Sequence, residues 1–260
     1  MQIFDAHTHI NAPQFKDDIP DVITRAHALD VTAMLVLADS SASNARLQEL
    51  LALDDHIYGA LGCHPETALD YGPKWEELLL TTMQNPRYKA VGEIGLDYYH
   101  DAPHDVQKRI FIRQLELAQE LHRPVVIHTR DALADTYDIM QAIQPQDGVI
   151  MHSFNGDAHW AEKFLACGYY LSFSGVVTFA NAPEVREAAL ITPADRLLVE
   201  TDAPYLAPIP MRGAMNEPGF TRYTLEFLAQ IRGTTATTLA AQTFANTKRI
   251  LKINEWKDKN

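Results

Sequence analysis

Eight short apolar runs separated by helix-length segments predict that this chain of 260 residues folds as a (β/α)8 TIM barrel. Most of the runs are continuous and do not alternate with polar residues, which is typical of parallel strands covered on both faces. Alternation of such strands with crossover helices indicates an α/β fold, and eight repeats favour a closed barrel.

The expected strands are the apolar runs themselves. They centre on residues 3–4, 31–37, 57–61, 90–91, 125–127, 149–151, 169–173 and 197–199. A doubly wound open sheet is the structural alternative. It would normally place a glycine-rich phosphate loop after its first strand, and His7-Thr8-His9-Ile10 stands there instead.

The expected helices lie between these strands. Residues 105–121 are the clearest, because Phe111, Leu115 and Ala118 share helical spacing and Pro124 prevents continuation. The same pattern is found in residues 41–53, 74–83, 132–142 and 157–166, and the final 40 residues are expected to be helical and to close the outer layer. No internal repeat or low-complexity segment divides the chain, so residues 1–260 are expected to form one domain.

Composition limits the partners and the compartment. The net charge of −12 opposes non-specific binding to duplex phosphate, although bound divalent cations would still make a pocket locally positive. Cys63 and Cys167 give no disulfide framework, which suits a reducing compartment. Because no signal peptide or membrane-length apolar stretch is found, we expect a cytoplasmic protein that needs no membrane, and no obligate protein partner is evident.

Six potential metal ligands fall where the expected strands end. They are His7, His9, Glu93, His128, His152 and Asp202. Side chains two apart on a strand point to one face, so His7 and His9 can bind one ion together. The carboxyl ends of barrel strands meet at one mouth, where four imidazoles and two carboxylates are enough for two divalent ions. Glu93 is expected to bridge the ions, because its strand lies across the ring from the first.

A metal pair at this mouth indicates a hydrolase, since bound cations activate water and polarise the electrophile. Glu93 and Asp202 are the expected catalytic residues, and Asp202 could accept the proton from the attacking water. As an alternative, Asp202 caps a helix or forms a turn before Ala203-Pro204. Six other histidines are expected to serve the surface or packing: His27, His56, His100, His104, His122 and His159.

Further polar residues follow the same strand ends. Asp5 and Glu200 stand two residues before ligands, so both are expected to point into the barrel, where a buried carboxylate needs a partner. Arg130 could pair with such an acid or meet a substrate phosphate. A thiolate pair of Cys63 with His64 is disfavoured, because adjacent strand residues face opposite sides. No G-x-S-x-G turn is present either.

Seven motifs in order along the chain resemble the TatD family of metal-dependent deoxyribonucleases. They are Asp-Ala-His-Thr-His at 5–9, Gly-Cys-His-Pro at 62–65, Gly-Glu-Ile-Gly-Leu-Asp at 92–97, His-Thr-Arg at 128–130, His-Ser-Phe at 152–154, Glu-Thr-Asp-Ala-Pro-Tyr at 200–205 and Asn-Glu-Pro at 216–218. The glutamate motif and the Glu-Thr-Asp-Ala-Pro block are specific, whereas H-x-H is shared by the wider amidohydrolase superfamily. The resemblance implies a TIM barrel and a phosphodiesterase that uses divalent metals.

The resemblance also assigns residues to roles. It implies that His7, His9, Glu93 and Asp202 bind one ion, that Glu93, His128 and His152 bind the second, and that His64 meets a substrate phosphate. Together with His64, the expected substrate-side residues are Arg130, Glu200 and Arg212. One departure concerns residues 210–215, Pro-Met-Arg-Gly-Ala-Met, where relatives usually carry a basic loop. Only Arg212 remains of that positive charge, for phosphate contact or for a loop-anchoring salt bridge.

The leading hypothesis is therefore a metal-dependent phosphodiester hydrolase. It would act as a 3′→5′ exonuclease on single-stranded DNA, with a metal-activated water and two divalent ions (Mg²⁺, Mn²⁺ or Zn²⁺). Because residues 210–215 keep only one positive charge, an amidohydrolase-type hydrolase of a small amide, lactone or phosphoester remains the alternative. A third possibility, a binding scaffold with structural metal, is disfavoured, because structural sites tend to be closed.

Overall fold

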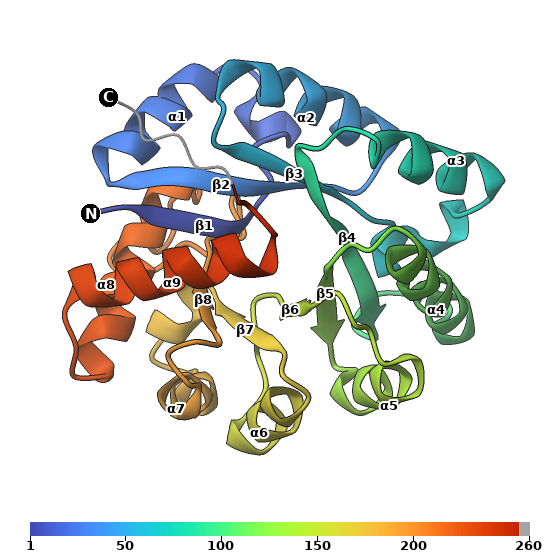
Figure 1. The fold of residues 1–260 in the computed structure, drawn as a ribbon. Helices are drawn as coiled ribbons and strands as arrows, with labels where there is room; N and C mark the ends of the chain where they lie inside the picture. Colours follow the sequence, from blue (N-terminus) through green and yellow to red (C-terminus); the bar gives the residue numbers. More distant parts are fainter. Residues whose placement is uncertain (255–260) are drawn as a thin grey trace.

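The computed structural model describes residues 1–254 and shows a (β/α)8 TIM barrel (Figure 1). Eight parallel strands pair in sequence order within one sheet. Their bounds are β1 Ile3–Thr8, β2 Val31–Ala38, β3 Ile57–Leu61, β4 Tyr88–Asp97, β5 Val125–Arg130, β6 Val149–Met151, β7 Tyr170–Phe173 and β8 Leu197–Val199. The predicted fold class and all eight strands are confirmed, so the predicted ligands share one end of a barrel.

Helices surround the strands on the outside of the barrel (Figure 1). They are α1 Ile19–Ala28, α2 Ser41–Leu53, α3 Pro73–Thr82, α4 His104–Glu120, α5 Leu133–Ile143, α6 Ala158–Ala166, α7 Pro183–Ile191, α8 Thr221–Ile231 and α9 Ala236–Ile250. The five helices predicted by residue range are confirmed to within one or two residues. Within the described part of the chain, no helix has the length and apolar character that a bilayer crossing requires.

The C-terminal helices confirm most of the prediction for the final 40 residues, of which residues 255–260 lie outside the described ones. Helix α9 lies beside β1 and β8 (Figure 1). Its Phe244 packs on Phe4 of β1 with ring centroids 5.9 Å apart, within a buried cluster that includes one or more residues of every strand. The helix therefore packs against the barrel strands themselves and is more than an outer layer.

The first and last strands meet at the mouth of the barrel. An isolated parallel bridge pairs Thr8 with Ala203. The N–H of His9 donates to the carbonyl of Ala203 at 2.8 Å, and the N–H of Asp202 donates to the carbonyl of His7 at 2.9 Å. These bonds bring the backbone of the H-x-H pair beside that of Asp202.

Strand β4 is much longer than its apolar run. The sequence suggested that Glu93 follows a strand ending near Val91, but β4 continues to Asp97 and carries Glu93 within it. The run is interrupted because Gly92 and Gly95 supply no side chain, whereas the backbone stays extended. Glu93 therefore lies within the strand, between the paired residues Val91 and Ile94, and not in a loop.

Gly95 is required where β4 meets β5. Its φ is 147°, and a Cβ added there would lie 1.9 Å from the carbonyl oxygen of His128, its partner in the sheet. Neither backbone can yield without separating the strands that carry Glu93 and His128. We expect Gly95→Ala to destabilise the protein by about 3 kcal/mol, a fall in Tm of roughly 6–12 °C by thermal circular dichroism.

Gly72 provides the matched control for this substitution. Its φ is −172°, and nothing lies within 4 Å of an added Cβ. Gly72→Ala should change stability by less than about 1 kcal/mol, the scale of a weakened helix N-cap. Equal melting temperatures for the two variants would contradict the close approach at Gly95.

Candidate metal centre

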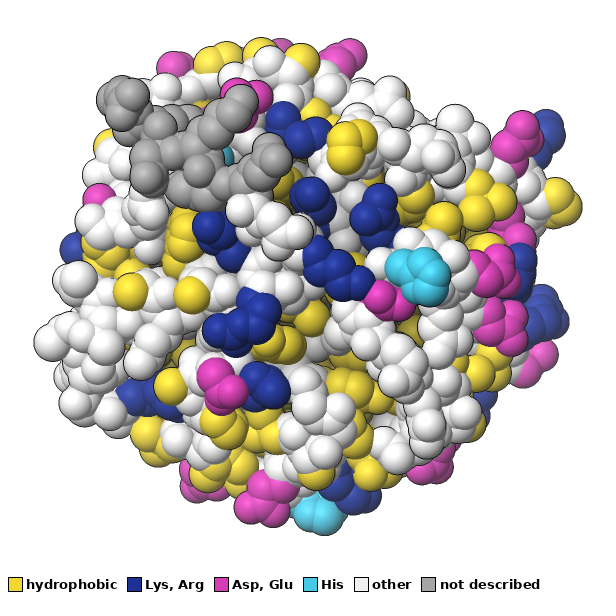
Figure 2. All heavy atoms as spheres, viewed as in Figure 1, with side chains coloured by type: hydrophobic (Ala, Val, Ile, Leu, Met, Phe, Trp, Pro, Cys, Tyr) yellow, Lys and Arg dark blue, Asp and Glu magenta, His cyan; other side chains and the backbone are white. Residues whose placement is uncertain are grey.

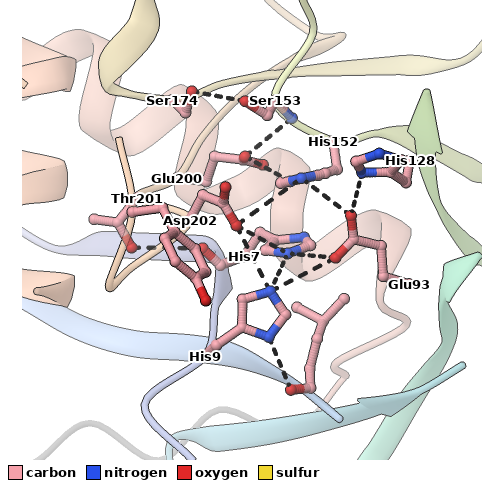
Figure 3. Close-up of polar contacts among 12 residues, drawn as sticks. His7, His9, Glu93, His128, His152, Ser153, Ser174, Glu200, Thr201 and Asp202 are labelled. Atoms are coloured by element: carbon pink, nitrogen blue, oxygen red, sulfur yellow. Dashed lines mark hydrogen bonds and ion pairs between the residues drawn. The ribbon is translucent and has the colours of Figure 1, made fainter. Parts of the chain in front are cut away.

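The predicted ligands lie in and beneath one cavity of about 1190 Å³ at the C-terminal ends of the strands. Figure 3 shows their side chains converging from β1, β4 and β5 and from the segments that follow β1, β6 and β8. His9, Glu93, His128, His152 and Asp202 line the cavity wall. His7 has no exposed surface and lies deeper, beneath them. The structure thus brings all six predicted ligands together.

Four side-chain atoms form the first group of ligands. The Nε2 atoms of His7 and His9 lie 3.1 Å apart, and His7 Nε2 lies 3.2 Å from Glu93 Oε2. Asp202 Oδ1 is 3.6 Å from each imidazole nitrogen, and His9 Nε2 is 3.6 Å from Glu93 Oε2. Atoms about 2.0–2.2 Å from one cation lie roughly 2.9–3.5 Å apart in octahedral or tetrahedral shells. The donor set and its spacing therefore fit a divalent cation.

The other carboxylate oxygen of Glu93 faces a second group. Glu93 Oε1 lies 2.7 Å from His128 Nδ1 and 3.3 Å from His152 Nε2. His64 Nε2 is 3.7 Å from the same oxygen, so His64 lies within the reach of a metal ligand as well as facing the cavity. Glu93 presents one oxygen to each group, which is the arrangement that a carboxylate bridging two cations requires.

Second nitrogens of the ligand rings are held by partners that orient the rings. His128 Nε2 lies 2.9 Å from Asp97 Oδ2, His152 Nδ1 lies 2.7 Å from Glu200 Oε1, and His9 Nδ1 lies 3.2 Å from the carbonyl of Leu37. Glu200 was expected on the substrate side, but it is fully buried behind His152. It does interact with an imidazole, as a buried carboxylate pointing into the barrel should.

Asp97 and Asp5 complete the buried acids near the centre. Sequence reasoning assigned no role to Asp97, although this residue ends the motif Gly-Glu-Ile-Gly-Leu-Asp at 92–97 and follows Glu93 at an even spacing. That spacing is the signal that could have placed both residues on one face, had the strand been extended past Val91. Asp5 accepts bonds from the N–H and hydroxyl of Thr201, at 2.9 and 2.6 Å, and so ties β1 to the segment after β8.

Asp202 sits in a turn and still points at the ligands. Its φ is 60°, and its carbonyl accepts from the N–H of Tyr205 at 2.9 Å. The side chain is 15% exposed and faces His7 and His9. The turn expected as the alternative role is therefore what aims the carboxylate into the mouth.

Burial and paired charges shift the pKa of Glu93 and those of two histidines in opposite directions. Burial alone would raise the pKa of Glu93, but the charges of His152 and His7 outweigh it and hold that pKa well below its usual range. Burial opposes protonation of His128 and His152, yet neighbouring carboxylates raise their pKa values to about 9 and about 10. Without cations, His128 and His152 are imidazolium groups paired with the carboxylate of Glu93.

Metal binding at this centre should depend steeply on pH. A cation must displace the proton of His128 and that of His152, whose pKa values are raised to about 9 and about 10, so affinity rises with pH until those values are passed. We expect Mn²⁺ to bind roughly 100-fold or more tightly at pH 8 than at pH 6, as the displacement of at least one proton requires. Calorimetry in buffers of different ionisation enthalpy would measure the proton release. Binding that is independent of pH would contradict the protonation of these two histidines.

His64 and Cys63 are both uncharged at neutral pH. Burial is the largest cause that lowers the pKa of His64 to about 3, and the positive charge of His128 is the second. Burial raises the pKa of Cys63 to about 11, and this residue is almost fully buried. A thiolate–imidazolium pair is therefore excluded here, as the sequence suggested.

The two predicted arginines differ in their positions. Arg130 lines the cavity, and its guanidinium lies 3.7 Å from the ring centroid of Tyr99, which is 63% exposed. Arg212 is outside the described lining of the cavity and stacks on Phe179 at 3.8 Å. Within residues 1–254 neither arginine forms an ion pair with an acid. Of the two, Arg130 is the one that lines the cavity.

Comparison with known proteins shows that this chain is similar to one family over nearly its whole length. A family model described as TatD related DNase matches residues 4–252. The uncharacterized metal-dependent hydrolase YabD of Bacillus subtilis is 39% identical over 254 residues, covering 97% of this chain and 100% of that protein. The 3′-5′ ssDNA/RNA exonuclease TatD of Escherichia fergusonii is 31% identical over 259 residues, covering 97% of this chain and 100% of that protein.

A solved structure agrees with these matches. The crystal structure of YJJV, a TatD homolog from Escherichia coli K12, superposes with a TM-score of 0.87 at 27% identity. The match covers 95% of this chain and 97% of that one. The residues matched by the family model include every ligand described above and the supporting acids Asp97 and Glu200.

Proposed function

Because this chain belongs to the TatD-related DNase family of metal-dependent hydrolases, we propose that it hydrolyses phosphodiester bonds of single-stranded DNA from the 3′ end. The observation that carries the proposal is the placement of Glu93, whose two carboxylate oxygens face separate groups of ligands. The printed name of the Escherichia fergusonii relative supports the class of substrate and the direction of cleavage. We further propose that two divalent cations bind there, with Mg²⁺, Mn²⁺ and Zn²⁺ as the candidates.

Each residue of the centre then has a task. When bound, a pair of cations lowers the pKa of a water molecule and withdraws charge from the phosphate. Glu93 holds the two binding groups at a fixed separation, because β4 fixes its backbone on both sides. Asp202 accepts the proton of the attacking water, since its carboxylate reaches the cavity and burial raises its pKa.

On the substrate side of the cavity we assign roles to a neutral histidine and to a positively charged arginine. His64 is neutral, so its ring can donate a hydrogen bond to a phosphate oxygen without carrying charge. Arg130 supplies a permanent positive charge at the wall, and its stack on Tyr99 fixes the plane of the guanidinium. A phosphate held between these two side chains lies next to the ligands of the second group.

One observation favours a second candidate function. Positive charge is scarce at the cavity, and Arg212 stacks on Phe179 outside its lining. A small amide, lactone or phosphoester would need less positive charge than a polynucleotide. Comparing turnover of a cyclic amide, a lactone and thymidine 5′-p-nitrophenyl phosphate separates the two functions, because carbonyl turnover alone would reverse the order.

The main test is cleavage of 5′-labelled single-stranded DNA by protein stripped with a chelator. We expect no cleavage by the stripped protein and a ladder shortened from the 3′ end after addition of Mg²⁺, Mn²⁺ or Zn²⁺. A blunt duplex of the same sequence serves as the control and should be cut more slowly. A folded, metal-loaded protein that leaves the strand intact with every cation would refute the proposal.

A further inference from the structure

A second cluster of potential ligands lies in the wall of the same cavity. It consists of Glu66, just after β3, Asp97 at the end of β4, and His100 in the loop that follows. His100 was expected at the surface or in packing, but its Nδ1 atom lies 3.0 Å from Glu66 Oε1 and 3.0 Å from Asp97 Oδ2. None of the tasks proposed above uses Glu66 or His100.

We propose that Glu66, Asp97 and His100 bind a third divalent cation beside the two-cation centre. Only the role of this third ion rests on the proposed function, because the ligand set itself is independent of that function. Two carboxylates and one imidazole are ligands that Mn²⁺ and Zn²⁺ accept. Their charges also neutralise a dication.

The distances within the cluster fit a shared cation. Ligands about 2.1 Å from an ion in neighbouring octahedral positions lie roughly 3.0 Å apart, as His100 Nδ1 does from both oxygens. This nitrogen is shielded from solvent and makes no hydrogen bond of ordinary geometry with either. Asp97 is held in place, because its Oδ1 accepts from the N–H groups of Tyr99 and His100 at 2.9 and 3.2 Å.

The charge of the cavity supplies a reason for a third cation. Five carboxylates line it against two guanidinium groups, those of Arg46 and Arg130, a formal charge of −3. Two dications would leave only +1, whereas a third would bring the wall to +3. No other Lys or Arg of residues 1–254 is part of this lining, and Figure 2 shows Lys and Arg side chains gathered around the centre of the face viewed in Figure 1. A third ion would replace the positive charge that residues 210–215 lack.

The position of the cluster suggests what the ion would contact. Asp97 Oδ2 lies 2.9 Å from His128 Nε2, and the other nitrogen of that ring faces Glu93, so one imidazole separates the cluster from the second group. Glu66 is exposed and His100 half-exposed, which leaves coordination positions open to the cavity. The oxygen of a phosphate neighbouring the scissile one is the ligand that fits there.

Counting bound Mn²⁺ tests the site directly. Stripped protein would be titrated with Mn²⁺ at pH 8, and the unbound ion measured by electron paramagnetic resonance. We expect saturation at three ions per chain for the unaltered protein and at two for His100→Ala and for Glu66→Gln. Both side chains are more than a third exposed, so the variants should fold, and circular dichroism would verify this.

The matched control is His122→Ala, because this histidine is 84% exposed and lies outside the cavity lining. It should keep three ions. Saturation of the unaltered protein at two ions, or retention of three by both cluster variants, would overturn the third site. The count is independent of nuclease activity: three ions without DNA cleavage would refute the proposed function alone, and two ions with cleavage would refute the third site alone.

Discussion

Replacing Glu93 with glutamine is expected to lower kcat/KM for single-stranded DNA by at least about a thousandfold. Glutamine keeps the shape of the side chain but removes the negative charge that faces both ligand groups. It also leaves His128 and His152 with one carboxylate partner fewer. Both cations should bind more weakly, and the loss should appear in kcat as well as in KM.

The measurement is single-turnover cleavage of labelled DNA together with the metal content of each sample. Glu77→Gln, an exposed carboxylate on α3, is the control for loss of one negative charge and should cleave at the unaltered rate. A Glu93→Gln variant that retains both ions and more than about a tenth of the activity would show that the carboxylate does not join them.

Asp202→Asn is expected to produce the second largest loss, about a hundredfold or more in kcat. Asparagine removes both a charged ligand of the first group and the acceptor for the proton of the attacking water. It is the substitution of choice because Asp202 has a φ of 60°, a left-handed conformation that asparagine tolerates and alanine does not. The melting temperature should therefore stay within a few degrees of that of the unaltered protein.

Cleavage rates and bound Mn²⁺ would be measured together for this variant. We expect one ion fewer per chain than in the unaltered protein, since His128, His152 and Glu93 are left in place. Asp101→Asn, an exposed residue in the loop before α4, is the control. Full activity in Asp202→Asn would remove this residue from the proposed reaction.

Much of the centre could be predicted because it follows from two regularities. Strand residues alternate between faces, and parallel strands of a barrel end at one mouth. His7, His9, His128 and His152 follow apolar runs that are easily recognised, so their convergence needs no knowledge of loops. Glu93 was placed correctly at the mouth even though its strand was drawn too short.

The residues around the ligands were harder to place for physical reasons. Gly92 and Gly95 interrupt the apolar run, so the sequence did not show that β4 continues to Asp97. Asp97 was therefore not assigned to the face that carries Glu93. His100 lies in a loop, and the periodicity of apolar residues does not predict the path of a loop. From the sequence we expected a carboxylate or a phosphate as the partner of Arg130. Its stacking on the ring of Tyr99 was not expected, because stacking depends on the directions in which the two side chains point.

Anomalous scattering from crystals soaked in Mn²⁺ tests most directly whether Glu93 joins two cations. The arrangement of ligands predicts one peak beside Glu93 Oε2 with His7, His9 and Asp202, and another beside Glu93 Oε1 with His128 and His152. A single peak at these two groups of ligands, or a peak at either group that does not contact Glu93, would contradict the bridging role from which the proposed reaction follows.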